Sequence, residues 1–258
     1  MGLLDLNIDI VDHCNLNCAC CGHFSPLATK HFININRFED DCRQMSKLTN
    51  RYIGKIVLLG GEPLLHPQIS ELLKIARHYF EGSVGIDTNG IMLPEMSESF
   101  WHACRECSVI INVTRYPINI DYNKITTIGQ RECVRVIITG EDDGNKPRRW
   151  FHNFRDASGT QDIAHNFKTC KWHGKCLNIE DGKICTCVVP LKIRHLNRYF
   201  GEQFTVSGND YLDIHSVSKI EDILDVVNKP IPFCRYCLPN TDVEVEWSKS
   251  KHLLKEWI

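Results

Sequence analysis

Residues 3–21 of this 258-residue chain read LLDLNIDIVDHCNLNCACC, and this stretch decides what kind of fold can follow. Its first half, Leu3 to Val11, alternates apolar and polar residues, which predicts a β-strand with one buried face. Its second half places cysteines at positions 14, 18, 20 and 21, in the loop that follows directly. The sequence therefore begins with a strand that carries a group of thiols at its carboxyl end.

A strand followed by a helix recurs as one moves outward from this stretch. Short apolar runs predict strands at residues 53–59, 84–87, 108–113 and 134–138, and helical periodicity predicts helices at 37–48, 68–80 and 95–104. Strands separated by helices of about ten residues are typical of βαβ units and a parallel sheet. We therefore expect an α/β fold for the first part of the chain.

The pattern changes in the polar stretch 141–169, after which cysteines reappear. Residues 177–179 and 183–189 flank Asp181-Gly182 and predict a β-hairpin, because Asp-Gly favours a tight turn. Residues 220–227 and 243–257 fit helices. The sequence thus predicts two domains, an α/β part over residues 1–165 and a smaller cysteine-bearing part over residues 166–258.

Composition narrows the classes of function. A formal net charge of −2 argues against a basic nucleic-acid-binding surface. Asp5 and Asp9 interrupt the first apolar stretch, which therefore does not resemble an export signal, and no apolar run reaches the ~18 residues of a membrane span. We expect a cytoplasmic protein with neither membrane nor nucleic acid as a partner. In that compartment the 14 cysteines stay reduced, so metal binding or redox chemistry explains them best.

The first group of thiols has the spacing C-x3-C-x2-C through Cys14, Cys18 and Cys21. Three thiolates so close on one loop can ligate three irons of a [4Fe-4S] cluster, which normally takes four cysteines. The fourth iron then stays open for an external ligand, as the open position does in a catalytic metal site. A structural zinc site or simple burial of the thiols remains the alternative when this loop is taken alone.

A second motif, Gly60-Gly61-Glu62-Pro63, follows the second predicted strand. A glycine pair lets a ligand approach the backbone closely, and a glutamate can accept hydrogen bonds from an ammonium group. The carboxyl ends of parallel strands are also where α/β proteins place their sites. Taken alone, a strand-to-helix turn that begins at Pro63 explains the motif equally well.

Together, the Cys14–Cys21 loop, the Gly60–Pro63 loop and Thr88-Asn89-Gly90 resemble the radical S-adenosylmethionine (SAM) superfamily in order and spacing. The resemblance implies a partial (β/α)6 TIM-like barrel, with SAM bound to the open iron through its amino and carboxylate groups. It implies reductive cleavage of SAM to methionine and a 5′-deoxyadenosyl radical, which abstracts a hydrogen atom from the substrate. A flavodoxin- or ferredoxin-type electron donor is implied as a partner.

Carried over residue by residue, the resemblance assigns Cys14, Cys18 and Cys21 to the first cluster. The residues that it places near SAM are Gly60, Gly61, Glu62, Cys20, Asn89, Asn112 and Ile138. The glycines and Glu62 match the segment near the methionyl amine, the two asparagines lie at strand ends, and the fifth strand lies beside the adenine. Cys20 stands where the family usually has an aromatic residue, so the resemblance implies that only its backbone serves the adenine.

The C-terminal part carries cysteines at positions 170, 176, 185, 187, 234 and 237. A hairpin with thiols followed by a C-x2-C loop is typical of a metal site, for which zinc is one candidate. The layout resembles the "twitch" auxiliary-cluster domain, a shortened relative of the SPASM domain. That resemblance implies a second [4Fe-4S] cluster held by Cys170, Cys187, Cys234 and Cys237, with Cys176 and Cys185 as rivals for the first two positions.

A four-cysteine cluster has no open iron and suits electron transfer. The small twitch layout is similar to that of aminocyclitol dehydrogenases, which implies oxidation of a small sugar- or cyclitol-like molecule with the second cluster as electron acceptor. One rival is an epimerase, which needs a hydrogen-donating thiol such as Cys20, Cys133, Cys176 or Cys185. The others are a peptide-modifying maturase and a non-catalytic metal-binding scaffold. Cys104 and Cys107 are expected to be buried small hydrophobes.

Overall fold

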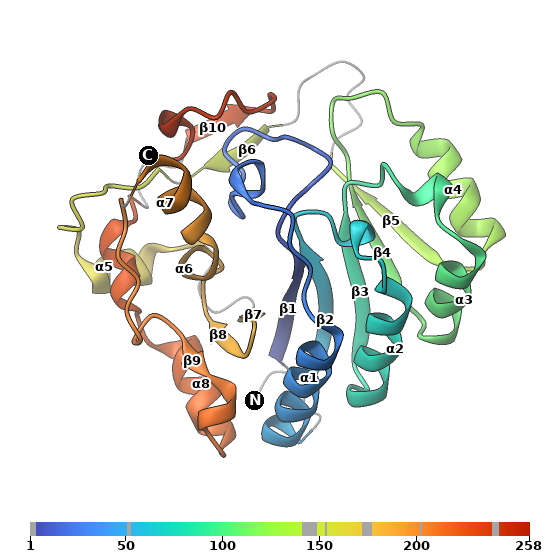
Figure 1. The fold of residues 1–258 in the computed structure, drawn as a ribbon, viewed down its shortest axis with the longest axis horizontal. Coiled ribbons are helices and arrows are strands. Elements are labelled where there is room, and N and C mark those ends of the chain that lie inside the picture. Colours follow the sequence, from blue (N-terminus) through green and yellow to red (C-terminus); the bar gives the residue numbers. More distant parts are fainter. Residues whose placement is uncertain are drawn as a thin grey trace.

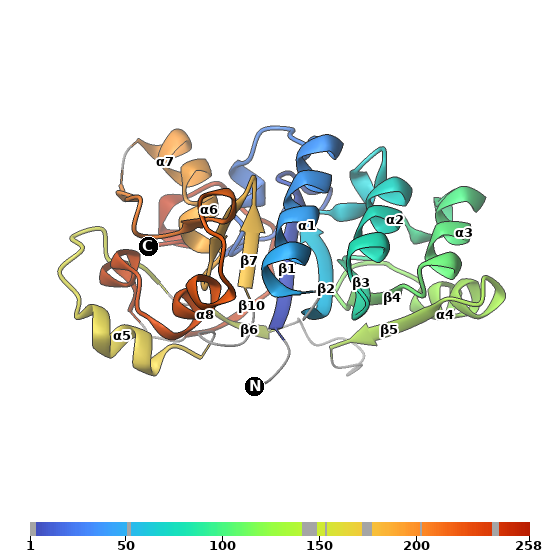
Figure 2. The ribbon, with the colours of Figure 1, turned by 90° about the horizontal axis from the view of Figure 1, so that it is seen from below.

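The computed structural model describes residues 4–50, 53–140, 149–152, 154–171, 177–201, 203–238 and 243–258. Its main feature is one open sheet of eight strands in the order β5-β4-β3-β2-β1-β7-β8-β9. Helices α1 to α4 cover one face of the first five strands, and the other helices gather beside β7 to β9 (Figures 1 and 2). The α/β class and the open, partial barrel are therefore confirmed.

The first half of the chain alternates strands and helices as predicted. Its elements are β1 (Leu4–Val11), α1 (Ile35–Thr49), β2 (Ile53–Gly60), α2 (Ile69–Tyr79), β3 (Ser83–Thr88), α3 (Glu98–Glu106), β4 (Ile110–Thr114), α4 (Tyr122–Arg131) and β5 (Arg135–Thr139). Neighbouring strands among these five are parallel. The carboxyl ends of the five strands therefore meet at one edge of the sheet.

Helix α4 is the one crossover helix that the sequence does not predict. Thr126, Thr127 and Gly129 have low helix propensity, so the segment lacks a strong local signal. Tertiary packing overrides this, because Ile125 and Ile128 are buried in the core. The Asp121 side chain also caps the helix by accepting a hydrogen bond from the backbone N–H of Lys124 at 2.9 Å.

The predicted hairpin supplies a sixth parallel strand. β7 (Leu177–Glu180) pairs parallel with β1 and antiparallel with β8 (Lys183–Cys185), and β9 (Leu212–Asp213) completes the sheet. Asp181 and Gly182 both have positive φ, 47° and 75°, as a two-residue type I′ turn requires. β8 ends at Cys185 instead of position 189, because the chain turns into α6 (Val189–Lys192), which has Pro190 in its first turn.

Helix α1 holds this turn against the barrel. The Arg37 guanidinium donates a hydrogen bond to the Asp181 carbonyl at 2.6 Å, and the Gly182 N–H donates to the Asp41 carboxylate at 2.8 Å. Gly182 has a φ of 75°, which L-residues rarely adopt, and a Cβ there would lie 2.0 Å from the Arg37 guanidinium, which would have to move. One sheet thus continues across the predicted boundary at residues 165/166, which itself stays a prediction.

The remaining elements of the C-terminal part are short. They are β6 (Arg149–His152), α5 (Ile163–Thr169), α7 (Arg194–Phe200), α8 (Ile220–Asn228) and β10 (Val243–Glu246), besides single turns of 3-10 helix. The helix fitted to residues 243–257 is wrong. That segment forms β10, which pairs antiparallel with β6, then an extended stretch and a 3-10 turn at Leu254–Glu256. None of the described helices is both long and apolar enough to cross a bilayer.

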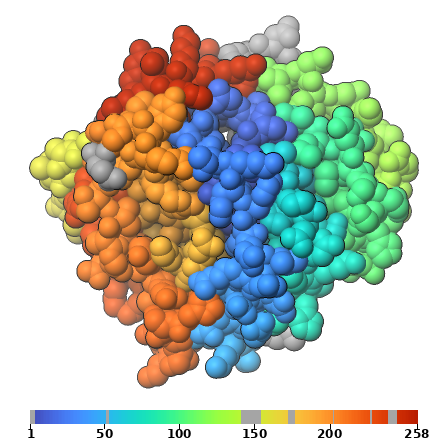
Figure 3. All heavy atoms as spheres, in the orientation of Figure 1, coloured from blue at the N-terminus to red at the C-terminus, as the bar shows by residue number. Residues whose placement is uncertain are grey.

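A second apolar cluster joins the two ends of the chain. Phe24, three residues after Cys21, and Trp257 are fully buried, and their ring centroids lie 6.3 Å apart. Phe200 of α7 approaches the same tryptophan at 6.2 Å. In Figure 3 the red C-terminal residues accordingly lie directly beside blue N-terminal residues at the top of the molecule. The loop after β1 is therefore enclosed by residues from the far end of the sequence.

Candidate functional site

The first thiol site is the loop that leaves the carboxyl end of β1. It carries Cys14, Cys18 and Cys21, and the thiols lie close enough to interact electrostatically. Burial, with smaller contributions from Glu62 and the two other thiols, raises the pKa of Cys14 to about 12. A free thiol of this pKa stays protonated at neutral pH, whereas a coordinated thiol is deprotonated by the metal. The predicted first ligand set is thus brought together.

Hydrogen-bond donors from the loop itself surround these sulfurs. The backbone N–H of Leu16 donates to Cys14 Sγ at 3.3 Å. Backbone N–H groups of His23 and Ser25 lie near the Cys21 thiol and favour its charged form, and the Phe24 N–H donates to the Cys21 carbonyl at 3.0 Å. Such donors stabilise a thiolate and tune the potential of a cluster bound to it. The donor set therefore fits three thiolate ligands of a [4Fe-4S] cluster.

Two further donors come from distant parts of the sequence. Asn89, directly after β3, places its Nδ2 3.6 Å from Cys14 Sγ and 2.7 Å from Asn15 Oδ1. The Trp247 indole N–H donates to Cys18 Sγ at 3.1 Å. The sequence identifies Asn89 through its motif, but it contains no local signal for Trp247, because 229 residues separate this residue from Cys18.

Trp247 belongs to a segment, residues 247–258, which we call the C-terminal strap. The strap runs antiparallel to the cysteine loop: Ala19 N–H donates to the Ser248 carbonyl and Ser250 N–H donates to the Asn17 carbonyl, both at 2.9 Å. Farther along, the Trp257 indole N–H donates to the Cys21 carbonyl at 3.0 Å. The strap therefore fixes the backbone of the loop that carries the three thiols.

The glycine pair after β2 is required by the neighbouring strand. A Cβ at Gly60 would lie 2.2 Å from the Val11 carbonyl, and one at Gly61 would lie 2.0 Å from the His13 carbonyl. Gly60 also has a φ of 136°, which L-residues rarely adopt. Glycine is thus needed at both positions because the backbone that leaves β1 passes directly beside them. The predicted contact of these glycines with SAM stays a prediction.

Glu62 joins the loops that follow β2 and β3. Its side chain is 1% exposed and accepts hydrogen bonds from Thr88 Oγ1 at 2.6 Å and from the Asn89 N–H at 2.9 Å. A third donor is the Leu64 N–H at 3.1 Å. Burial raises the pKa of this carboxyl above its usual value. In this structure Glu62 therefore positions Asn89, and its predicted contact with an ammonium group stays a prediction.

The other residues predicted near SAM lie on different surfaces. Asn112 of β4 lies on the face opposite to the helices, where its Nδ2 donates to Asp87 Oδ1 of β3 at 2.8 Å. Ile138 of β5 instead packs against the core on the helix side, so only its backbone could reach an adenine on the open face. Cys20 has a φ of 57°, directly beside the ligand position Cys21.

The second thiol site gathers cysteines from three separate segments. Cys170 follows α5, Cys187 follows β8, Cys234 lies within the 3-10 helix Pro232–Tyr236, and Cys237 directly follows that helix. Burial raises the pKa of Cys234 to about 12, with further contributions from the Cys237 and Cys170 thiols. Burial likewise raises the pKa of Cys187, beside Cys237. The four predicted ligands of the second cluster are thus neighbours.

Two details bear on which thiols would bind there. The Cys185 thiol donates its proton to the Asp210 carbonyl at 3.0 Å and is fully buried, which favours its neighbour Cys187 as the ligand. Asn166 donates to the carbonyls of Cys234 and Cys237 at 2.8 and 2.7 Å and so shapes the C-x2-C loop. Cys176, the remaining rival, lies outside the described residues.

In the part of the chain that the structure describes, no three His, Cys, Asp or Glu side chains converge as ligands of a single metal ion. A [4Fe-4S] cluster binds each thiolate to a different iron, so its ligands surround a larger centre.

Four of the remaining cysteines have structural positions. Cys42, Cys104 and Cys107 are buried in the core, which confirms the prediction for the last two. Cys133 is exposed and lies two residues before the start of β5. It therefore lies at the amino edge of the sheet, opposite to the edge that carries the cysteine loop, and cannot supply a hydrogen atom there.

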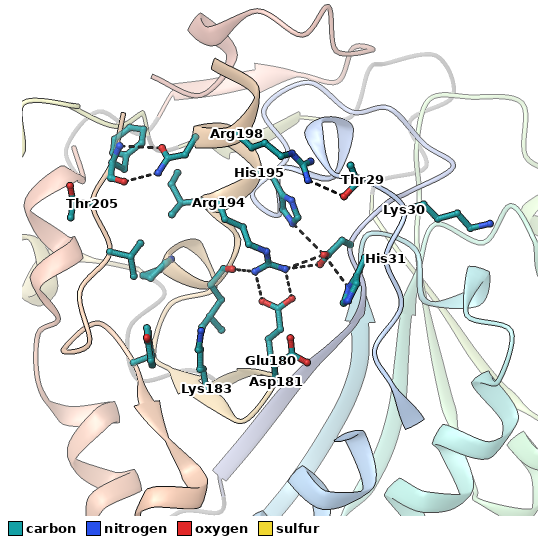
Figure 4. Close-up of a pocket in the computed structure, with 18 residues that line it drawn as sticks. Thr29, Lys30, His31, Glu180, Asp181, Lys183, Arg194, His195, Arg198 and Thr205 are labelled. Atoms are coloured by element: carbon teal, nitrogen blue, oxygen red, sulfur yellow. Dashed lines mark hydrogen bonds and ion pairs between the residues drawn. The ribbon is translucent and has the colours of Figure 1, made fainter. Parts of the chain in front are cut away.

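A buried ionic network surrounds Asp12, two residues before Cys14, and Figure 4 shows its Glu180, Arg194 and His195 side chains. Lys192 is 1% exposed and places its Nζ 2.7 Å from the Asp12 carboxylate and 2.6 Å from that of Glu180. Arg194 contacts the same two carboxylates at 3.0 and 2.7 Å. Because Asp12 follows β1 and Glu180 ends β7, these contacts join the barrel to the C-terminal part.

The ionic network forms one wall of a cavity of about 930 Å³ between the loop at residues 29–31 and helices α6 and α7 (Figure 4). None of the residues predicted to contact iron or SAM lines this cavity.

Comparison with known proteins agrees with this geometry. The model of the radical SAM superfamily matches residues 8–141. A curated relative, probable GTP 3′,8-cyclase of Methanothermobacter thermautotrophicus, is 30% identical over 179 residues, which cover 69% of this chain and 57% of that protein. The corresponding protein of Thermoplasma volcanium is 25% identical over 148 residues, 56% of this chain and 43% of that protein. The chain thus spans about half the length of these relatives.

Among solved structures, BtrN in complex with AdoMet and 2-DOIA has a similar fold. The two structures match with a TM-score of 0.57 over 92% of this chain and 94% of that chain, at 14% sequence identity. The likeness extends over both the barrel and the C-terminal part.

Proposed function

This chain belongs to the radical SAM superfamily, and from that premise we propose that it oxidises a small polar molecule, such as a sugar or cyclitol. Membership implies one [4Fe-4S] cluster and SAM. When bound, these supply a 5′-deoxyadenosyl radical, and a second cluster would supply an electron acceptor. The main support for oxidation is that Cys170, Cys187, Cys234 and Cys237 lie near one another. Four cysteine ligands would leave no iron of a bound cluster open, and such a cluster suits electron transfer.

The residues around the first site prepare it for this chemistry. Cys14, Cys18 and Cys21 would hold the first cluster, and the N–H groups around them stabilise the thiolate form. Glu62 fixes Asn89 at the carboxyl edge of the sheet. The C-terminal strap covers one side of the loop and so limits the access of water to it.

The open face of the sheet supports a polar substrate. Apolar residues of the strands face the helices, and strand alternation turns polar residues toward the other side. Farther along their strands these are Asn7, Asp87 and Asn112, and Val57 and Leu59 of β2 lie on the same face; Asp5, Lys55 and Arg135 lie at the amino ends of their strands. Oxidation of an alcohol there removes one hydrogen atom, one proton and one electron, two electrons in all. A surface of this composition offers hydrogen-bond partners to hydroxyl and amino groups.

A second candidate follows from the sequence comparison. The curated relatives at 25–30% identity are described as GTP 3′,8-cyclases, which favours a redox-neutral reaction on a nucleoside triphosphate. Their matched regions extend over 56% and 69% of this chain. Two of the four thiols named for epimerisation have less support, because Cys133 lies at the amino edge of the sheet and the Cys185 thiol donates its proton to the Asp210 carbonyl.

The test is anaerobic reconstitution with iron and sulfide, followed by incubation with SAM and dithionite. We expect about eight irons per chain and formation of 5′-deoxyadenosine. Deuterated polyols and aminocyclitols are then offered in parallel with GTP. Deuterium in 5′-deoxyadenosine, together with a ketone product, supports the oxidation.

A cyclised product from GTP alone would contradict the oxidation and support the second candidate. Tightly bound zinc without SAM cleavage would contradict both and favour a metal-binding scaffold.

A further inference from the structure

Arg155 is a buried cation for which the described residues provide no hydrogen-bond partner. Arg155 is 8% exposed, and its Nε and Nη1 atoms are buried without a hydrogen-bond partner among the described residues. Its guanidinium lies 5.3 Å from the centroid of the Phe24 ring, a weak attraction compared with the cost of removing a charge from water. A buried, unpaired charge of this kind indicates that an anionic group belongs beside it.

The backbone places Arg155 against the second thiol site. Arg155 and Cys237 form an isolated antiparallel bridge, and the flanking Asp156 N–H donates to the Tyr236 carbonyl at 2.8 Å. The charged forms of the Cys237 and Cys187 thiols interact favourably with the guanidinium. Arg155 thus faces two of the four proposed ligands.

We propose that Arg155 is the counter-ion of the second thiol site and raises the reduction potential of the cluster bound there. The proposal rests on the proposed function for the presence of that cluster. Four thiolates around a [4Fe-4S] core of charge +2 carry a net charge of −2, and reduction by one electron makes it −3. A neighbouring positive charge stabilises the reduced form more than the oxidised form, so it makes the cluster a better electron acceptor.

The counter-ion role predicts opposite stability effects in two forms of the protein. In the metal-free form the neighbouring thiols are neutral, and Arg155→Met replaces an unpaired charge by an apolar chain of similar length. The melting temperature should then stay the same or rise. In the metal-loaded form the same substitution removes the partner of an anionic centre, and the melting temperature should fall. A merely structural role would lower both temperatures.

The potential itself is measured by redox titration with electron paramagnetic resonance. A Cys14/Cys18/Cys21→Ala background leaves only the second cluster to titrate. We expect Arg155→Met to lower the equilibrium constant for its reduction about tenfold, a shift of about 59 mV for one electron. Arg155→Lys should restore most of the potential, because it keeps the charge.

Arg235→Met is the matched control. This arginine lies between Cys234 and Cys237 in the sequence, but its guanidinium bonds to the Tyr236 hydroxyl at 2.9 Å and lies over that ring. Its removal should shift the potential less than Arg155→Met.

The outcomes separate the two proposals. A second site that binds zinc instead of iron contradicts the proposed function, while the two melting temperatures still decide whether Arg155 is a counter-ion. An iron cluster whose potential is unchanged in Arg155→Met, with both melting temperatures lowered, overturns the counter-ion role and leaves the proposed function standing.

Discussion

The two thiol sites of this molecule are built in opposite ways. The first takes Cys14, Cys18 and Cys21 from eight consecutive residues, and neutral N–H donors from the loop, Asn89 and Trp247 surround its sulfurs. The second takes its thiols from three segments and has a buried cation, Arg155, beside it. A local loop can keep one coordination position open, whereas a site closed from several directions encloses its centre. The contrast fits a first site that binds SAM and a second that exchanges only electrons.

Removing either ligand set gives the largest expected effects. Cys14/Cys18/Cys21→Ala should abolish 5′-deoxyadenosine formation and leave about four of eight irons. Cys187/Cys237→Ala should also leave about four irons but retain uncoupled cleavage of SAM. Iron analysis and chromatography of 5′-deoxyadenosine measure both. If the second variant also lost cleavage while keeping the first cluster, the two sites would not be functionally separate.

The ionic network between the two halves is the next largest target. Lys192→Met leaves the buried Asp12 and Glu180 carboxylates with Arg194 as their shared partner, although Asp12 keeps its contacts with His31 and His195. Because a buried ion pair is then broken, we expect a loss of about 3–5 kcal/mol in the free energy of unfolding. Urea denaturation of the metal-free protein measures this. Lys183→Met, which removes an ammonium that lies over the Tyr211 ring, is the control and should cost far less. Equal losses would show that the network does not join the halves.

A smaller effect is expected from the donor that the strap contributes to the first site. Trp247→Phe keeps an aromatic ring but removes the N–H bond to Cys18 Sγ. A hydrogen bond to a ligand sulfur favours the reduced cluster. Its loss should therefore lower the equilibrium constant for reduction of the first cluster about threefold, and the reduction potential with it. Redox titration in a Cys187/Cys237→Ala background measures it. An unchanged potential would mean that the strap only covers the loop.

The smallest expected effect is the loss of stability at acidic pH that results from the buried imidazole of His66. His66 accepts a hydrogen bond from Gln68 N–H at Nδ1, so its Nε2 carries the proton directed at the Ile33 carbonyl. Burial lowers the pKa of this imidazole below 6.5, and the unfolded chain therefore binds a proton more readily. Its contribution to stability is complete above pH 6.5 and is lost as the pH falls below it.

Denaturation of the metal-free protein at pH 7.5 and at lower pH tests this, and His66→Gln should flatten the pH dependence. His102→Gln, on the exposed side of α3, should leave it unchanged. A wild-type protein that gained stability on acidification over this range would contradict the expectation for His66.

The sequence predicts well those structural features that depend on residues close to one another along the chain. The alternation in β1, the cysteine spacing and the Asp181-Gly182 turn are local, and the structure contains the expected strand, thiol loop and hairpin. The sequence does not predict helix α4, because the stability of this helix comes from the burial of Ile125 and Ile128 rather than from helix propensity.

Contacts that join distant segments leave no such pattern. Residues 243–257 have side-chain spacing compatible with a helix, but β6 and the cysteine loop offer their backbone N–H and carbonyl groups, and the segment pairs with them instead. The roles of Trp247, Asn166 and Arg155 depend on the same kind of long-range placement. These residues could be found only after the chain was folded in space.

The strap also sets an order of events during synthesis. Trp247 is translated 229 residues after Cys18, which takes about 10–50 s at a rate of about 5–20 residues per second. The cysteine loop can leave the ribosome during this interval, when the strap that covers it does not yet exist. A nascent chain therefore presents its first three thiols openly to iron donors and to oxidants alike, and they become enclosed only after the strap has been made.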